Sequence, residues 1–319
     1  MSELFTGIRE AAADVARNAR FVHLLEDQIA SYAASLSLRG LPAPEYDREH
    51  HYTGSPADTA AFLLALDSVN FGSGYFPHLQ KRPGMSGYFT IATSLKERWE
   101  QTGPLTTAEL RGMTDGDCAA LFGQSLSDPA IAELMAHFAQ TLRDLGEWLA
   151  GYDDDPLAAI AASGGSAAAL VADLARMPLF RDVALYNGRA VPLYKRGQLL
   201  AADLALAFDH TGPGAFHDLD DLTIFADNLV PHVLRLDGLL AYDPSLLARI
   251  ERGDLIAAGS PEEVEIRAVA LHAVERVVAA MRANGVSATA RELDYLLWHR
   301  GQDPRIKAHP RHRARSVFY

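Results

Sequence analysis

Cysteine is almost absent from this sequence of 319 residues, in which Cys118 stands alone. One cysteine cannot form an intrachain disulfide or a thiolate metal cluster, so the composition is typical of the reducing cytoplasm. No apolar run approaches the roughly 20 residues of a membrane-spanning helix. The first residues also lack the apolar core of a signal peptide. We therefore expect a soluble cytoplasmic protein that binds no membrane.

Positive charge is also scarce. Lysine and arginine total 29 residues against 41 aspartates and glutamates, which gives a net charge of −12. Proteins that bind DNA or RNA release counterions through clustered basic residues, and such clusters are missing before the C-terminal tail. The sequence therefore favours a small-molecule ligand over a nucleic acid. It does not indicate an oligomeric state.

The motifs that bind nucleotide cofactors are missing as well. Residues 71–75 contain two glycines but lack the third glycine and the preceding strand of a dinucleotide site, and no GxxxxGK[ST] or GxSxG motif occurs. Two histidine pairs, His50 with His51 and His309 with His312, lack further ligands at the spacing of a metal site. We expect neither a cofactor nor a metal.

The distribution of apolar residues predicts a mainly α fold. Apolar positions recur every three or four residues in the segments 14–33, 56–69, 130–149, 167–175, 194–208, 245–252, 261–284 and 289–300. Ser55-Pro56 and Asp128-Pro129 supply a capping side chain followed by proline, which is typical of helix starts.

Evidence for strands is limited to one small β-hairpin at residues 183–193. Asn187-Gly188 supplies the turn residues that a two-residue hairpin loop requires. With 49% hydrophobic residues, the chain can bury a core as one domain over residues 1–319 or as two closely packed helical lobes, about 1–160 and 161–319.

One carboxylate stands out because of its apolar surroundings. Asp227 lies inside the apolar segment 216–242, and a helix through this segment would bury most of its circumference together with Asp227. An unpaired buried carboxylate is costly or has a raised pKa. The residues alone leave three interpretations: Asp227 is paired, it caps a helix, or it is kept for chemistry.

Several further motifs accompany Asp227 along almost the whole chain. In order they are VARNAR at 15–20, LDSVNF at 66–71, SGY at 86–88, YKRGQLLAAD at 194–203, LTIFADNLVP at 222–231, EVEIR at 263–267, LDYLLW at 293–298 and HRARSVFY at 312–319. Each motif alone is weak, but this set in this order resembles the queuosine salvage protein family, the queuosine 5′-phosphate N-glycosylase/hydrolases.

Two segments differ from the common pattern of that family. Many members have a Phe-Trp pair soon after the Asn-Phe motif, where this chain has Gly72-Ser73-Gly74. The family also often has Tyr-Arg after the aspartate, where this chain has Asn228-Leu229. An arginine contact to substrate therefore does not transfer to this position.

The resemblance implies hydrolysis of the N-glycosidic bond of queuosine 5′-monophosphate, within a single all-helical domain similar to DNA glycosylases. The products would be the base queuine and ribose 5-phosphate. Breaking this bond produces an oxocarbenium-like ribosyl cation, which a fixed anion in a dry site stabilises. Asp227 is the expected catalytic anion. Because a 7-deazapurine has no basic N7 to protonate, one dominant carboxylate is favoured over an acid and base pair.

Cationic side chains are candidates for binding the 5′-phosphate. Lys195 and Arg196 are adjacent in one of the motifs, and Arg313 and Arg315 are further candidates near the C-terminus. The alternative is that these charges are solvated on a helix surface.

Aromatic and acidic side chains are candidates for binding the base. Asp294, Tyr295 and Trp298 lie within one helical turn, where an acid could meet the cationic aminomethyl group and a ring could stack. Phe225 is another candidate for stacking, and Asn228 belongs to the same motif. The alternative is that Tyr295 and Trp298 are core residues and Asp294 is a surface charge.

Three residues of the N-terminal half complete the predicted substrate site. His51 could hydrogen-bond the sugar or phosphate, although His50 competes for this role. Asp67 and Asn70 could reach the base or ribose, whereas Asp67 could equally pair with a buried arginine such as Arg267.

Two other classes of function stay open. One is an enzyme that excises bases from nucleic acid, and the other is a module that binds queuine or a nucleotide without cleavage.

Overall fold

Helices make up most of the computed structural model, which describes residues 2–36 and 44–319. The elements are α1 Glu3–Asn18, β1 Val22–Leu24, α2 Ile29–Ser35, α3 Pro56–Ser68, α4 Gly87–Thr102, α5 Thr107–Gly112, α6 Asp115–Leu121, α7 Pro129–Ala150, α8 Pro156–Ala161, α9 Ala167–Leu174, β2 Val183–Tyr186, β3 Arg189–Pro192, α10 Lys195–Ala207, α11 Val230–Leu236, β4 Leu240–Tyr242, α12 Pro244–Arg252, α13 Pro261–Ala283, α14 Ala290–Arg300 and α15 Pro304–Lys307. The predicted mainly α fold is confirmed.

The predicted helix starts are also confirmed by their caps. The Ser55 hydroxyl accepts the backbone N–H of Asp58, and the Asp128 carboxylate accepts that of Ala130, with proline in the first turn of both helices. These side chains satisfy N–H groups that have no partner within the helix.

The predicted helix over residues 14–33 is wrong, because α1 ends at Asn18 and the chain continues into β1. Glu265 Oε2 accepts the backbone N–H groups of residues 20–22 at 3.0, 2.6 and 3.1 Å. A carboxylate that binds three successive N–H groups removes them from helical hydrogen bonding. The sequence also gave no sign that β1 pairs antiparallel with β4.

The hairpin of β2 and β3 forms where the sequence predicts it. The two strands pair antiparallel from Val183 opposite Pro192 to Tyr186 opposite Arg189. The turn residues Asn187 and Gly188 have φ angles of 49° and 77°. This left-handed backbone is the one that a tight hairpin turn requires.

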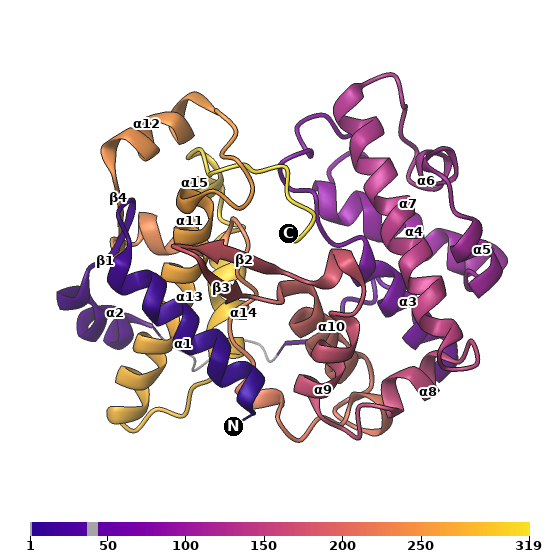
Figure 1. Ribbon diagram of the computed structural model, residues 1–319, viewed down its shortest axis with the longest axis horizontal. Coiled ribbons are helices and arrows are strands. Elements are labelled where there is room, and N and C mark those ends of the chain that lie inside the picture. Colours follow the sequence, from indigo (N-terminus) through magenta and orange to yellow (C-terminus); the bar gives the residue numbers. More distant parts are fainter. Residues whose placement is uncertain (1, 37–43) are drawn as a thin grey trace.

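Figure 1 shows how the helices are arranged around the hairpin and α10. Helices α3 to α8 gather on one side, and α1, α2 and α11 to α15 gather on the other. Helix α1 packs against α13, so the start of the chain lies against its C-terminal half. A division into lobes near residue 160 stays a prediction. None of the helices in the described residues is long and apolar enough to cross a membrane.

A buried ion pair joins four parts of this fold. Arg267 of α13 donates to both carboxylate oxygens of Asp182 at 2.9 and 2.6 Å, and both side chains are at most 3% exposed. Arg267 Nε also donates to the carbonyl of Ala226 at 2.8 Å, and Asp182 accepts the backbone N–H of Lys195 at 3.1 Å. The alternative in which Arg267 pairs with Asp67 is therefore wrong.

Replacing Arg267 by methionine is expected to lower the free energy of unfolding by about 3–5 kcal/mol, because it leaves the Asp182 carboxylate buried without its partner. Urea denaturation monitored by circular dichroism measures the change. Arg305→Met is the matched control, because Arg305 is 89% exposed in its ion pair, and we expect no measurable change in stability. An Arg267 variant with the stability of the wild type would contradict a stabilising role for the pair.

Candidate active site

The segment that carries Asp227 is not the helix that its apolar pattern suggests. Residues 222–229 have no helical structure, and α11 begins only at Val230. The buried Gln198 side chain holds this segment, because its Oε1 accepts the N–H of Thr223 at 2.9 Å while its Nε2 donates to the carbonyl of Leu193. A helix over the whole of 216–242 therefore does not form, and α11 is the α-helical part of this segment. Tertiary hydrogen bonds have taken the place of helical ones.

Asp227 caps the start of α11. Its Oδ1 accepts the N–H groups of Leu229 at 2.7 Å and Val230 at 3.2 Å. Such a contact satisfies backbone donors where the helix begins and fixes the carboxylate relative to the backbone. The side chain is half-buried, and none of the described residues donates a hydrogen bond to Oδ2. The capping interpretation is confirmed, and it leaves one carboxylate oxygen for a ligand.

Asp294 of α14 lies close to Asp227. Its Oδ1 accepts the N–H of Phe225 at 2.9 Å, so it holds the same segment from the other side. Burial raises the pKa of Asp294 to about 7, and the negative charge of Asp227 acts in the same direction. The alternative in which Asp294 is a surface charge is wrong, because Asp294 is only 6% exposed.

Lys195, the first residue of α10, interacts electrostatically with several acids. Its Nζ donates to the carbonyl of Asn70 at 3.4 Å. Burial lowers the pKa of Lys195, while Asp227, Asp67 and Asp294 oppose this effect. These acids therefore lie within electrostatic reach of one ammonium group. The predicted alternative of a solvated helix charge is wrong for Lys195, which is 7% exposed.

A second acid pair comes from α3 and α10. Asp67 is fully buried and accepts a hydrogen bond from Asn70 at 3.1 Å. Burial raises the pKa of Asp67 to about 6. Burial also raises the pKa of Asp203 well above its usual value, and the charge of Asp67 adds to this effect. Sequence reasoning did not select Asp203, although it closes the motif that contains Lys195.

His51 contacts the tyrosine that interacts with this acid pair. Its Nε2 lies 2.7 Å from the hydroxyl of Tyr88, and burial lowers the pKa of His51 to about 4, so it is neutral at pH 7. Burial raises the pKa of the Tyr88 hydroxyl, and the charges of Asp203 and Asp67 add to this effect. His50 instead pairs with Asp47 at 2.9 Å and stacks on a phenylalanine of α4. Of the two competing histidines, His51 is therefore the one linked to the acids, through Tyr88.

Arg196 does not have the surroundings of a phosphate ligand. Its guanidinium donates to two carbonyl oxygens in the last turn of α3 and to the carbonyl of Leu179. It lies between the rings of Phe71 and Phe180, at 4.7 and 4.4 Å, and is 2% exposed. We therefore correct its predicted role: Arg196 joins α10 to α3 within the core.

The C-terminal tail, residues 311–319, passes beside the site and explains one departure from the family pattern. Tyr319 accepts the N–H of Gly72 at 2.9 Å through its carbonyl. A Cβ atom on Gly74 would lie 2.1 Å from the carbonyl oxygen of Ala314. Asn228 donates to the carbonyl of His312 at 3.3 Å, so it holds the tail as well. The glycines let this backbone approach closely.

Within that tail, Arg311 is the arginine that lies near Asp227, and the sequence did not single it out. Burial lowers the pKa of Arg311, and the charge of Asp227 opposes this shift. Arg313 instead donates to the carbonyl of Gly253, and Arg315 pairs with Glu133 at 3.2 Å.

The aromatic candidates are half-buried. The rings of Tyr295 and Trp298 both pack against His299, with centroids at 4.2 and 5.2 Å. Phe225 is half-buried beside the core. Base stacking by these three rings stays a prediction.

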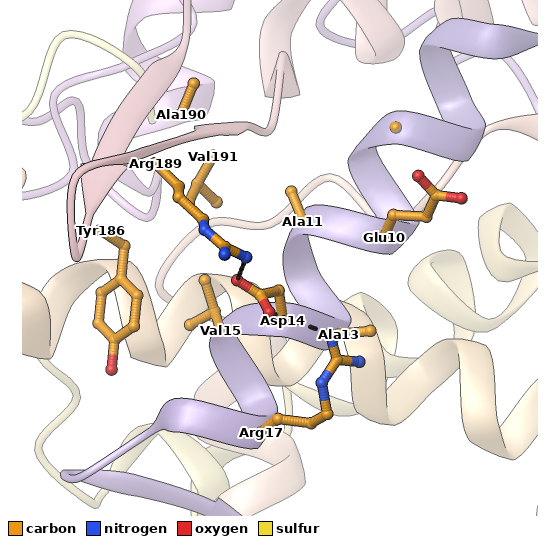
Figure 2. Close-up of a pocket in the computed structure, with 11 residues that line it drawn as sticks. Glu10, Ala11, Ala13, Asp14, Val15, Arg17, Tyr186, Arg189, Ala190 and Val191 are labelled. Atoms are coloured by element: carbon orange, nitrogen blue, oxygen red, sulfur yellow. Dashed lines mark hydrogen bonds and ion pairs between the residues drawn. The ribbon is translucent and has the colours of Figure 1, made fainter.

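A separate groove of about 500 Å³ lies between α1 and the β2–β3 hairpin (Figure 2). Asp14 pairs there with Arg17 at 3.0 Å and with Arg189 at 3.1 Å. None of the predicted site residues lines this groove. We place the candidate site at the acids around Lys195, because desolvated titratable groups converge there.

The family model described as queuosine salvage protein matches residues 50–319. The chain belongs to this family. Proteins named queuosine 5′-phosphate N-glycosylase/hydrolase are similar to it over nearly their whole length: 39% identity over 318 residues for Sphaerobacter thermophilus and 28% over 334 residues for Mus musculus, each covering 98% of both chains. A Dictyostelium discoideum protein of that name is 31% identical over 82% of this chain and 78% of its own. The queuosine salvage family predicted from the motifs is confirmed.

The raised pKa of Asp294 predicts a pH dependence. Asp294 binds its proton more tightly in the folded protein, with a pKa of about 7 against 3.8. Its contribution to stability is therefore complete below about pH 4 and is lost as the pH rises through 7. Asparagine keeps the acceptor for Phe225 but does not titrate. Urea titrations give the free energy of unfolding of the wild type and of Asp294→Asn at each pH. The difference, wild type minus variant, should decrease as the pH rises from about 4.5 to about 8.

Asp303→Asn serves as the control for this pH dependence. The pKa of Asp303 is lowered to about 2, first by its hydrogen bonds with Arg305. Asp303 is therefore ionised in both the folded and the unfolded state throughout this pH range, and its difference curve should be flat. A flat curve for Asp294→Asn as well would contradict the desolvation of that carboxyl group.

Proposed function

We propose that this chain hydrolyses the N-glycosidic bond of queuosine 5′-monophosphate, with Asp227 as the anion that stabilises the ribosyl cation. The observation that carries the role of Asp227 is its fixed carboxylate, with Oδ1 held by two backbone N–H groups and Oδ2 accepting from none of the described residues. The names of the similar full-length proteins support the substrate and the reaction.

The chemistry of the bond explains why a fixed anion suits this site. As the bond between C1′ and N9 breaks, its electron pair leaves with the base and positive charge develops on the ribose ring. A water oxygen then bonds to C1′, and one water proton is transferred so that the base leaves as neutral queuine and the sugar as ribose 5-phosphate. The Asp227 carboxylate is already held in place before the bond breaks. It can therefore stabilise the cation without the energetic cost of moving into position. It can also accept the proton of the attacking water.

Lys195 and Arg311 support binding of the 5′-phosphate. Both are cations whose pKa values respond to the charge of Asp227, so both lie near the proposed reaction centre. Arg196 is left out because backbone carbonyls and two rings occupy its guanidinium.

A small nucleotide is the proposed partner, in preference to a nucleic acid. The net charge of −12 opposes binding of a polyanionic duplex, and the candidate site itself is rich in carboxylates. The single buried thiol, Cys118, supports the cytoplasmic location that we also propose.

Incubation of the purified chain with three substrates tests this function. Free base is measured by mass spectrometry after incubation with queuosine 5′-monophosphate, with queuosine and with a duplex that contains a damaged base. We expect release of queuine from the nucleotide. Release from the duplex alone would identify a base-excision enzyme, and binding of the nucleotide without release would identify a binding module.

Asp227→Asn is expected to lower kcat by about 10²- to 10⁴-fold while the Kd for substrate stays close to that of the wild type. Asparagine keeps an oxygen to accept the N–H groups at the start of α11 and removes only the charge. Asp128→Asn is the matched control, because Asp128 caps α7 at an exposed position, and its kcat should be unchanged. A fully active Asp227→Asn variant would rule out the proposed role.

A further inference from the structure

Two buried polar atoms near the acid pair of α3 and α10 have no partner among the described residues. They are Oδ2 of Asp67 and Nδ1 of His51. Asp67 is fully buried and His51 is 8% exposed. Buried polar atoms in folded proteins are nearly always hydrogen-bonded, so the unpartnered Oδ2 of Asp67 indicates a place for a ligand.

The packing of α10 on α3 turns Asp203 toward the same place. Arg196 donates to two carbonyl oxygens of α3, which shows that its face of α10 is directed at α3. Asp203 follows Arg196 by seven residues and therefore lies on the same face, two turns further along. The carboxyl group of Asp203 accepts no hydrogen bond from the described residues. Its charge and that of Asp67 both reach the hydroxyl of Tyr88.

The balance of charge around Lys195 favours a cationic ligand. Four carboxyl groups interact with this lysine directly or through one another, namely Asp67, Asp203, Asp227 and Asp294. Burial raises the pKa values of Asp67, Asp203 and Asp294, and the charge of Lys195 offsets this effect for all three. A bound cation would lower the electrostatic cost of ionising them.

We propose that Asp203 and Asp67 form a subsite that binds the cationic aminomethyl nitrogen on the base of the substrate. This inference rests on the proposed function. A protonated secondary amine has two N–H donors, which match Oδ2 of Asp67 and one carboxylate oxygen of Asp203. Hydrogen bonds between an ammonium and a carboxylate are stronger than those between neutral groups.

The shape of the substrate agrees with the position of this subsite. The glycosidic nitrogen N9 and carbon C7, which carries the aminomethyl group, belong to the same five-membered ring and are separated only by C8. The amine must therefore bind close to the carboxylate that acts on C1′. Lys195 interacts electrostatically with both Asp67 and Asp227, so both acids lie around the same lysine.

Asp203→Asn tests the subsite when two substrates are compared. One is queuosine 5′-monophosphate, and the other is 7-deazaguanosine 5′-monophosphate, which lacks the aminomethyl group. We expect kcat/KM for the first to fall about 10- to 100-fold, mainly through KM, because a charged hydrogen bond is lost. For the second we expect a change below about twofold, since no amine is present to lose a contact.

Asp209→Asn is the matched control, because it is an exposed aspartate just beyond the end of the same helix, and it should leave both substrates unaffected. An equal loss for both substrates in Asp203→Asn would overturn the proposal, since Asp203 would then support the fold or contact the base itself. The proposal would also be overturned if Asp294→Asn, and not Asp203→Asn, lowered kcat/KM only for the substrate that carries the amine. That result would assign binding of the amine to Asp294.

A second measurement needs no variant, so it holds even where Asp203→Asn fails to fold. The wild type should cleave queuosine 5′-monophosphate with a kcat/KM at least about tenfold above that for an analogue with a neutral hydroxymethyl group at C7. Equal values would contradict a cation subsite. A wild type that cleaves none of these nucleotides would instead contradict the proposed function, so the two failures are distinguishable.

Discussion

Arg267 reaches from the middle of α13 to three parts of the structure that are far apart in the sequence. It binds Asp182 beside the hairpin, holds the carbonyl of Ala226, and through Asp182 fixes the first N–H of α10. Asp227 follows Ala226 directly, and Lys195 begins α10. The positions of the proposed reaction centre and of its nearest lysine therefore depend on one ion pair, which is strong because both partners are excluded from water and fully hydrogen-bonded.

The acids near Lys195 illustrate how burial prepares a site for chemistry. Desolvation raises the pKa values of Asp67, Asp203 and Asp294, so their ionised forms are unfavourable without a nearby cation. The same low-dielectric surroundings strengthen the interaction of a carboxylate with a cationic amine or a developing ribosyl cation. A substrate that carries a cationic amine and develops a second positive charge on its ribose suits this arrangement. Phosphate binding then requires separate cations, which Lys195 and Arg311 can supply.

Many features of the fold could be predicted from local sequence. Ser55-Pro56 and Asp128-Pro129 are local signals that act within one helical turn, and Asn187-Gly188 sets the hairpin turn by its own backbone preference. The helix predicted over residues 14–33 failed because Glu265, more than 240 residues away, binds the N–H groups of residues 20–22. The apolar run around Asp227 was misleading for a similar reason, because Gln198 and Arg267 hold it in an extended path. Buried extended segments and buried helices share the same apolar composition.

The sequence by itself determined the family, through the order of its motifs, and it identified Asp227, Asp294 and Lys195 as functional candidates, because chemical character and neighbouring residues are local properties. Only the tertiary structure decided what each side chain contacts. It placed Asp203 and Arg311 with these residues, assigned Arg196 to the core, and showed that Gly74 admits the C-terminal tail. Such contacts depend on which surfaces the packed helices bring together, and residues distant in the sequence carry no local signal of that encounter.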